Sequence, residues 1–286
     1  MPITFSEHRC GALKAKISVI ITTWNRSKLL GNAIKSVLAQ SLPPLEILVC
    51  DDGSTDNTYE VVSSFADPRL VWIPSYHSGC PAIPRNRGIA RSKGDWISFL
   101  DDDDEWLPEK LAVQIALLKS LDCLAGCTHA TGINGLAGVE LYNLGWYEPL
   151  LTFRDLLHGN RVICSSALIH RSVLNKVGGF PEAVTLSSME DYAFWLRVAT
   201  VTDFAFVSEP LVTYTDSPQT SLRSACADAY QQKRIVFGNF LAWGCRNRIT
   251  AGYMKAALYM YGQVLLLKVR KQLAEYCECI SGRNAV

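Results

Sequence analysis

The sequence lacks a long hydrophobic run and a leader segment. No stretch reaches the roughly 18–20 uninterrupted apolar residues that a membrane-spanning helix needs. The first ten residues, MPITFSEHRC, contain no basic segment followed by an apolar one, so they do not predict a signal peptide. We therefore expect a cytoplasmic protein that works either free or at the inner face of the membrane.

An excess of charge and paired cysteine motifs are absent too. Lys and Arg number 28 against 27 Asp and Glu, and this net charge of +1 gives no electrostatic basis for binding nucleic acid. The ten cysteines are scattered, and the closest pairs, Cys123/Cys127 and Cys277/Cys279, do not form zinc knuckles. We expect most of the cysteines to be free thiols buried as small apolar side chains.

What the sequence contains is a large apolar fraction arranged in alternating short and long segments. The 286 residues are 49% hydrophobic, enough for one large domain or two small ones. Short β-branched runs alternate with segments of helical periodicity, which predicts an α/β protein with a mostly parallel sheet. The predicted strands are 17–23, 45–50, 70–74 and 95–100, and the predicted helices are 28–40, 58–66, 85–94 and 109–121.

The second half of the chain shows a weaker pattern. Five glycines between 126 and 145 predict irregular loops and short strands over 123–160. Beyond them we expect strands at 162–170 and 204–214, helices at 171–178 and 190–200, and mostly helix over 224–275.

Polar side chains follow three of the predicted parallel strands. These groups are Thr22–Asn25, Asp51–Asp52 and Asp101–Asp104. The carboxyl ends of parallel strands meet at one edge of a sheet, which is where ligands bind in such folds. The sequence therefore predicts one site built from three loops.

Four consecutive aspartates at 101–104 repel one another, and a divalent cation would remove that repulsion. Oxygen-only ligands suit Mg²⁺ or Mn²⁺, whose remaining ligands can be water and phosphate oxygens. The alternative is that acids such as Asp104 and Glu105 serve the N-terminus of the following helix.

Other polar residues suggest a nucleotide. Asp52 could accept a hydrogen bond from a base, Trp24 could stack on one, and Arg85 could pair with a pyrophosphate. The alternatives are a turn or cap for Asp51 and Asp52 and a core position for Trp24. Arg87 is a second candidate for the pyrophosphate, and Arg87 and Arg91 are equally plausible as solvated helix residues. Late in the chain, Glu190 and Asp191 begin a predicted helix. Either they cap it, or one of them is a general base.

Five motifs in order then carry a resemblance. They read ISVIITTWNR, SVLAQS, LEILVCDDGSTDNT, RNRGIARSKGDWISFLDDDDEWLPEKL and VGGFPEAVTLSSMEDYAFWLRVA. Over residues 15–215 the chain resembles the family 2 inverting glycosyltransferases with the GT-A fold. The resemblance implies a Rossmann-like sheet, a nucleotide-sugar donor that is usually UDP-linked, and Mn²⁺ or Mg²⁺.

The resemblance also implies a role for each site residue. Thr22 and Trp24 correspond to the nucleoside pocket, Asp52 to the acid that reads uracil, and Arg85 to the diphosphate side. Asp101 and Asp103 match the metal-binding DxD pattern, with Asp103 the best ligand, and Asp102 can reach the ribose or the metal. Asp191 corresponds to the base that deprotonates the acceptor hydroxyl in a single inverting displacement, with Glu190 as the alternative.

The chain departs from the family pattern at two places. The third loop reads HSGC and then PRN, where many relatives have Asn-x-Gly and then Ala-Arg-Asn. The segment YTDSPQTSLR lacks the His that many relatives have after the late strand. The resemblance divides the chain into a nucleotide-sugar half (15–125), an acceptor and catalytic-base half (126–215) and a C-terminal helical extension (216–286).

Several interpretations stay open at this stage. The acceptor is expected to be a saccharide or a lipid-linked glycan, but 123–160 and 216–286 carry no motif that identifies it. The tail either packs as a helical lid or homo-oligomer face, or rests on a membrane through Lys255, Lys268, Arg270 and Lys271. The alternative functions are a nucleotidyltransferase, which normally has a Gly-rich basic loop that is missing here, and a catalytically inactive nucleotide-sugar-binding module.

Overall fold

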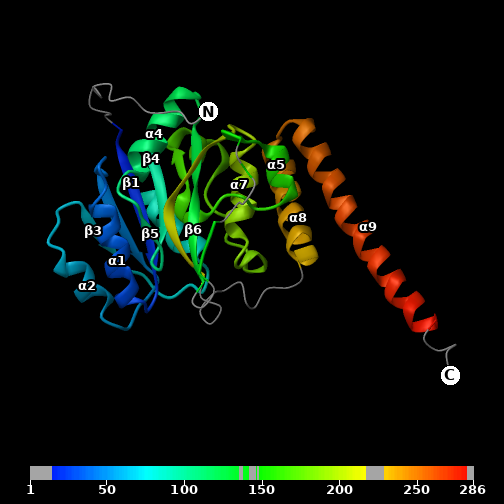
Figure 1. The fold of residues 1–286 in the computed structure, drawn as a ribbon, viewed down its shortest axis with the longest axis horizontal. Coiled ribbons are helices and arrows are strands. Elements are labelled where there is room, and N and C mark those ends of the chain that lie inside the picture. Colours follow the sequence, from blue (N-terminus) through cyan, green and yellow to red (C-terminus); the bar gives the residue numbers. More distant parts are fainter. Residues whose placement is uncertain (1–14, 135–137, 142–145, 147, 217–228, 282–286) are drawn as a thin grey trace.

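A computed structural model describes residues 15–134, 138–141, 146, 148–216 and 229–281. Its centre is a 10-stranded sheet whose main path has the strand order β3-β2-β1-β4-β9-β6-β10-β5, with β7 paired to β6 and β8 paired to β10 (Figure 1). Helices cover both faces of this sheet, and the last helix extends away from it.

The first part of the sheet is parallel, as predicted. Its strands are β1 (Ile17–Thr23), β2 (Glu46–Asp51), β3 (Leu70–Ile73) and β4 (Trp96–Asp101). The connecting helices are α1 (Ser27–Leu38), α2 (Thr58–Ser64) and α3 (Ala82–Arg91), and α4 (Lys110–Ser120) follows β4. The predicted strand and helix bounds agree with these to within a few residues.

Residues of β1 are buried on both faces of the sheet, as expected for a parallel strand between two layers of helices. Ile17, Val19 and Ile21 pack in the cluster that includes α1 and α4, whereas Ile20 packs in the cluster that includes α3 and α7 (Glu190–Val198). This alternation follows from the two-residue period of a strand.

The second part of the sheet is mixed. It consists of β5 (Glu105–Trp106), β6 (Ala125–Asn134), β7 (Gly138–Leu141), β8 (Leu150–Leu151), β9 (Leu168–His170) and β10 (Phe204–Asp216). β9 pairs antiparallel with both β4 and β6, so the same sheet continues from the first part into the second. The division at residue 125 stays a prediction.

Two predictions for this part are wrong. The region 123–160 contains a ten-residue strand, β6, rather than short strands only. Gly126 is part of this strand, and glycine suits the position because a Cβ there would lie 3.1 Å from the Ala205 carbonyl oxygen. The predicted strand 162–170 is a strand only from Leu168, since Cys164–Ser166 form a 3-10 turn, η1.

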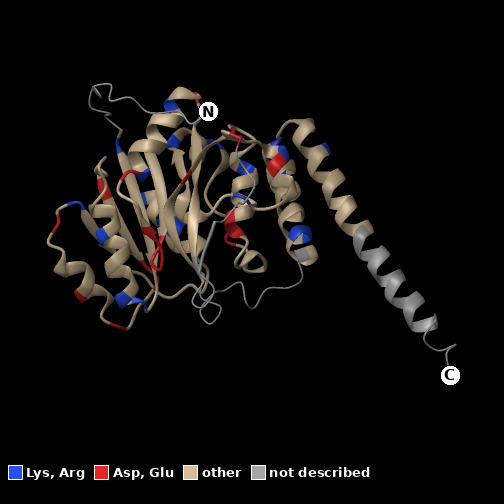
Figure 2. Cartoon of the chain, in the orientation of Figure 1, with Lys and Arg blue, Asp and Glu red and all other residues tan. Residues whose placement is uncertain are grey.

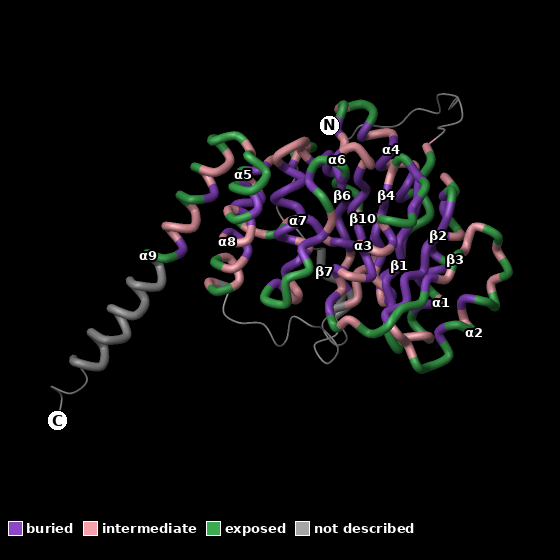
Figure 3. The backbone as a smooth tube through the Cα atoms, turned by 180° about the vertical axis from the view of Figure 1, so that it is seen from behind, coloured by how far each residue is buried: buried purple, intermediate pink, exposed green. Residues whose placement is uncertain are grey.

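The remaining helices are α5 (Phe153–His158), α6 (Arg171–Val177), α7, α8 (Ala229–Asn247) and α9 (Ala251–Ser281). The helical C-terminal extension is thus confirmed for its described residues. Burial is concentrated in the sheet and in the helices packed on it, whereas residues 251–266 of α9 are mostly half-buried or exposed (Figure 3). None of the helices in the described ranges is long and apolar enough to cross a membrane.

Six cysteines are free thiols in the structure. Cys50, Cys80, Cys123, Cys127 and Cys164 are buried, and Cys245 is exposed. Burial raises the pKa of Cys50 to about 12, so this thiol stays protonated near neutral pH. The five buried cysteines act as small apolar side chains, as predicted.

Candidate functional site

The three predicted loops meet at one edge of the sheet. β1, β2 and β4 run parallel, with Thr22 in register with Asp101 and Thr23 in register with Asp51. The Thr22 hydroxyl also donates to Asp101 Oδ1 over 3.3 Å. Acidic residues lie at this edge and at the start of α7 (Figure 2).

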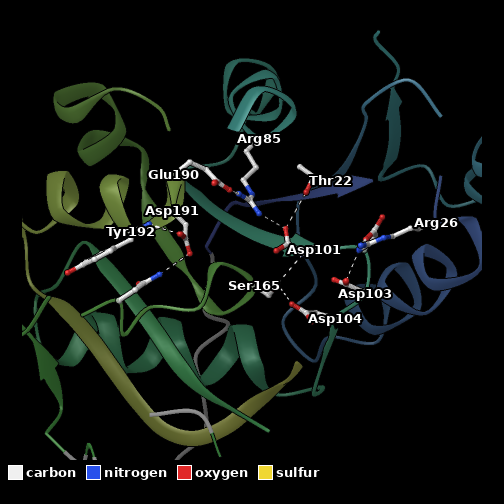
Figure 4. A network of polar contacts seen from close by, with 12 residues as sticks. Thr22, Arg26, Arg85, Asp101, Asp103, Asp104, Ser165, Glu190, Asp191 and Tyr192 are labelled. Carbon is white, nitrogen blue, oxygen red and sulfur yellow. Dashed lines mark hydrogen bonds and ion pairs between the residues drawn. The ribbon is translucent and has the colours of Figure 1, made fainter. Parts of the chain in front are cut away.

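Arg85 joins these two acidic groups. It comes from α3 and is buried, with Nη2 2.7 Å from Asp101 Oδ1 and Nη1 2.7 Å from Glu190 Oε1 (Figure 4). Burial lowers the pKa of Arg85, but the neighbouring Asp101 and Glu190 carboxylates outweigh that and hold it well above its usual value. The guanidinium is therefore permanently charged between the two carboxylates.

Two atoms of this bridge keep unused hydrogen-bonding capacity. Glu190 Oε2 and Arg85 Nε are buried and have no hydrogen-bond partner among the described residues. Buried polar atoms are normally satisfied, so both are suited to meeting a ligand.

The four aspartates occupy different environments. The side chains of Asp101 and Asp103 are 30% and 22% exposed. Asp102 is buried, and burial raises its pKa to about 7 although Arg26 lies 3.1 Å away and opposes this. Asp104 is buried too, and its carboxylate accepts hydrogen bonds from the Ser165 hydroxyl and from the Thr215 backbone N–H.

Asp101 and Asp103 are therefore the members of the run that fit a divalent cation. They are the two most accessible carboxylates of the run. Burial, and to a smaller extent the negative charge of Asp101, raises the pKa of Asp103. A bound cation would lower this pKa again. Within the described part of the chain, no three His, Cys, Asp or Glu side chains are grouped to hold a metal ion. The donor set fits Mg²⁺ or Mn²⁺ only if water and substrate oxygens supply the other ligands.

The helix-terminus interpretation of Asp104 is wrong. α4 begins at Lys110, six residues later, with Glu109 at its N-cap. Asp104 instead ties the aspartate loop to η1 through Ser165 and to the end of β10 through Thr215. The Ser165 hydroxyl also accepts from the Asp101 backbone N–H at 3.1 Å, so Ser165 holds both ends of the run.

At the other end of the site, Asp52 and Trp24 lie with residues of the loop after β3. Asp52 is buried and accepts from the Ser78 N–H and hydroxyl, each at 2.8 Å, and its Oδ2 lies 3.0 Å from His77 Nδ1. Trp24 is 47% exposed and stacks on His77, with ring centroids 4.0 Å apart. Gly53 (φ +85°) permits this close approach, because a Cβ would lie 2.5 Å from His77 N.

Asp51 has the structural role that was one of its alternatives. Its carboxylate accepts from the Ser54 N–H at 2.9 Å and from Trp72 Nε1 at 3.3 Å. The core interpretation of Trp24 does not agree with its exposure, although one face of its indole is stacked on His77.

Glu190 and Asp191 differ in their surroundings. α7 begins at Glu190, its N-cap is Met189, and Glu190 itself is engaged by Arg85 rather than by the helix terminus. The Asp191 side chain accepts from Asn160 Nδ2 at 3.0 Å and from the Tyr192 N–H at 2.6 Å. Asp191 is half-buried, so it is the more accessible carboxylate of the pair.

Five residues of the site, among them Asn160, were not singled out from the sequence. Arg26, His77 and Ser78 each lie in a loop that the sequence assigned to the site, so their position could have suggested them. Ser165 gave no such signal, because its contact with Asp104 joins residues 61 positions apart.

Comparison with known proteins identifies the family of the chain. The family model described as Glycosyl transferase family 2 matches residues 18–178, more than half of the chain. WfgD of Escherichia coli, a UDP-Glc:alpha-D-GlcNAc-diphosphoundecaprenol beta-1,3-glucosyltransferase, is 29% identical over 184 residues, which cover 64% of this chain and 69% of WfgD. WcaA of E. coli (strain K12), a putative colanic acid biosynthesis glycosyl transferase, is 41% identical over 190 residues (64% and 65% coverage).

Solved structures give the same fold. S. aureus TarS 1–349 in complex with UDP is similar with a TM-score of 0.67 at 23% identity, covering 87% of this chain and 70% of that one. The mannosyltransferase PcManGT from Pyrobaculum calidifontis, in complex with GDP-Man and Mn²⁺, is similar with a TM-score of 0.58 at 16% identity (93% and 80% coverage). The expected GT-A fold is confirmed, and the chain belongs to glycosyl transferase family 2.

Proposed function

We propose that this glycosyltransferase moves a sugar from a UDP-linked donor to a saccharide or lipid-linked glycan, with inversion at the anomeric carbon. The observation that carries the proposal is the Arg85 bridge. It joins Asp101, at the end of β4, to Glu190, beside Asp191 at the start of α7, so that a donor-side carboxylate and a candidate base belong to one site. The UDP complex of TarS and the UDP-Glc donor in the name of WfgD support the choice of nucleotide.

In the proposed reaction, Asp191 accepts the proton of the acceptor hydroxyl while that oxygen attacks the anomeric carbon from the face opposite the UDP. The bond from the anomeric carbon to the phosphate oxygen breaks, and UDP leaves with the electron pair. Asn160 orients the Asp191 carboxylate through its 3.0 Å hydrogen bond. Arg85 holds Glu190 in place beside the base through its 2.7 Å contact.

Asp101 and Asp103 would hold Mn²⁺ or Mg²⁺, and an ion bound there supplies positive charge to the leaving diphosphate. Asp102 and Asp104 take part by fixing the loop, because both are buried and engaged by protein groups. Trp24 and Asp52, joined by His77, form the proposed nucleoside end of the site with Thr22.

The proposed acceptor side includes helix α9. WfgD acts on a diphosphoundecaprenol-linked sugar according to its name, which supports a lipid-linked acceptor here. Leu258, Tyr259, Leu265 and Leu266 are exposed on α9, and residues 251–274 contain Lys and Arg but no acidic residue. An apolar, cationic helix suits the anionic cytoplasmic face of a membrane.

A pair of variants tests the proposed chemistry. Asp191→Asn keeps the shape of the side chain but cannot take a proton at neutral pH, so transfer should fall by about 10²–10⁴-fold, the usual contribution of a positioned base. Binding of UDP with Mn²⁺ should be unchanged. Asp103→Ala, in contrast, should change binding: it should abolish the Mn²⁺-dependent part of UDP binding, measured by calorimetry.

The outcomes assign the base. Near-normal turnover in Asp191→Asn together with an inactive Glu190→Gln would make Glu190 the base, since Glu190 Oε2 is unpartnered among the described residues. Equal UDP affinity in EDTA and in Mn²⁺ would contradict the metal part of the proposal. If both carboxamide variants stay active, the pair at the start of α7 does not supply the base.

A further inference from the structure

Arg26 is held at the site by its backbone. It follows β1 and lies at the N-cap of α1, where its carbonyl accepts hydrogen bonds from Leu29 and Leu30. The residues on either side are fastened to the next loop: Asn25 N–H donates to Ser54 at 2.9 Å, and Ser27 N–H donates to Asp56 at 3.0 Å. The fold therefore fixes where the Arg26 side chain starts.

The Arg26 guanidinium lies on the aspartate run. Its Nη1 is 2.6 Å from Asp103 Oδ2 and 3.1 Å from Asp102 Oδ1 (Figure 4). Asp102 is buried, so this contact belongs to the interior of the loop. Asp103 is partly exposed, and the Arg26 side chain is 31% exposed, so the Arg26–Asp103 pair borders solvent.

A guanidinium on Asp103 conflicts with the proposed metal ligand role of that residue. A divalent cation needs the lone pairs of the oxygen that Arg26 occupies, and two cations at one carboxylate repel each other. An ion pair this exposed contributes little stability, so it can be exchanged. A diphosphate brought to the site would offer Arg26 a new partner, because the planar fork of arginine suits phosphate oxygens.

We propose that Arg26 is the resident cation of the aspartate run, which keeps divalent metal off Asp103 until a nucleoside diphosphate draws the guanidinium away. This inference rests on the proposed donor and metal site and adds an order to it. Metal and nucleotide then bind cooperatively, each raising the affinity of the other by the same factor, since coupling between binding sites is reciprocal.

The test is a titration of the full chain with Mn²⁺, followed through the electron paramagnetic resonance signal of the free ion, with and without saturating UDP. Arg26→Met should bind Mn²⁺ roughly fivefold or more tightly than the native chain when UDP is absent. UDP should tighten Mn²⁺ binding strongly in the native chain and much less in the variant. Arg26→Gln, which can still donate to Asp102, repeats the test should Arg26→Met fold poorly.

Arg69→Met is the matched control. Its side chain is 29% exposed and pairs with Asp67 at 2.8 Å, but it lies away from the aspartate run, so its loss should leave Mn²⁺ affinity at the native value. Native Mn²⁺ affinity in Arg26→Met and Arg26→Gln, with UDP coupling intact, would overturn the role of Arg26 alone. No Mn²⁺ binding by any of these proteins, with or without UDP, would overturn the metal site as well.

Discussion

At the scale of single residues, Arg85 forms ion pairs with two carboxylates at once. It neutralises the buried Glu190 and the partly exposed Asp101 with separate nitrogens. A lysine has one ammonium group and cannot reach both carboxylates in this way. The bridge therefore depends on the fork of arginine as well as on its charge.

Arg85→Lys should lower the free energy of unfolding by about 1–3 kcal/mol, because Glu190 or Asp101 loses its hydrogen bond from the guanidinium. It should also weaken UDP binding, since Asp101 loses its orienting contact. Urea denaturation and calorimetry measure the two effects. Arg91→Lys, an exposed position on the same helix, is the control and should change neither. Unchanged stability in Arg85→Lys would mean that the bridge is not formed in solution.

The sequence predicted some members of this site and not their partners, for a physical reason. Thr22, Asp52 and Asp101 follow parallel strands, and the geometry of a parallel sheet brings such positions to one edge. The contact of Arg85 with Glu190 joins residues 105 positions apart, and no periodicity in the sequence encodes it. The residues alone singled out the pair Glu190 and Asp191, and the choice of Asp191 as the base came from the resemblance to the family.

At the scale of the elements, α4 carries an unusual residue in its first turn. Lys110 is fully buried, donates to the Ser98 hydroxyl at 2.8 Å and lies 3.7 Å from the centre of the Trp106 ring. Among the residues that the structure describes, no ion pair is formed by it. Burial holds the pKa of Lys110 well below its usual value.

This burial predicts a pH dependence of stability. Between the lowered pKa of the folded state and the ordinary value, the unfolded chain binds a proton that the folded chain does not. Raising the pH within that window therefore increases the free energy of unfolding, by at most about 1.4 kcal/mol per pH unit, and lowering it decreases stability. Lys110→Met should remove this contribution.

Denaturant unfolding of both proteins at pH 7 and pH 9 measures the difference. The change from pH 7 to pH 9 should be more favourable in the native chain than in Lys110→Met, and the comparison cancels the titration of the cysteines. Identical changes in the two proteins would show that Lys110 is charged in the folded state.

The elements of the first half could be predicted closely because short β-branched runs there alternate with segments of helical periodicity. η1 could not, because Cys164–Ser166 leave the strand for contacts made by side chains elsewhere: Trp106 Nε1 donates to the Ser165 carbonyl and Gln114 Nε2 to the Ser166 carbonyl. The length of β6 could not be predicted either. The sequence does not distinguish a glycine required by close packing between strands, such as Gly126, from a glycine in a loop.

At the scale of the whole molecule, α9 extends from the body of the protein (Figure 1) and presents apolar side chains to solvent. One face of it packs on the rest of the chain through Ala257 and Val264. The exposed residues Leu258, Leu265 and Leu266 form the proposed membrane surface. Over 251–266 the only charged residue is Lys255.

Replacing Leu265 and Leu266 together by Gln should reduce binding to vesicles of anionic phospholipid about tenfold or more, since each buried leucine contributes apolar transfer energy. Co-sedimentation measures the binding. The matched control replaces Leu29 and Leu45, which are similarly exposed (44% and 43%) but lie on the first part of the fold. If the native chain does not bind vesicles but dimerises through α9, as measured by light scattering, the helix is a homo-oligomer interface instead.

The position of β9 between β4 and β6 has a consequence for substrate traffic. A protein built of two separate lobes can open between them to admit a substrate, but here the strand ladder runs unbroken from one part to the other. Opening it would break backbone hydrogen bonds inside the core. The proposed donor would then enter, and its nucleotide would leave, past loops at the rim of the sheet rather than between two lobes that open.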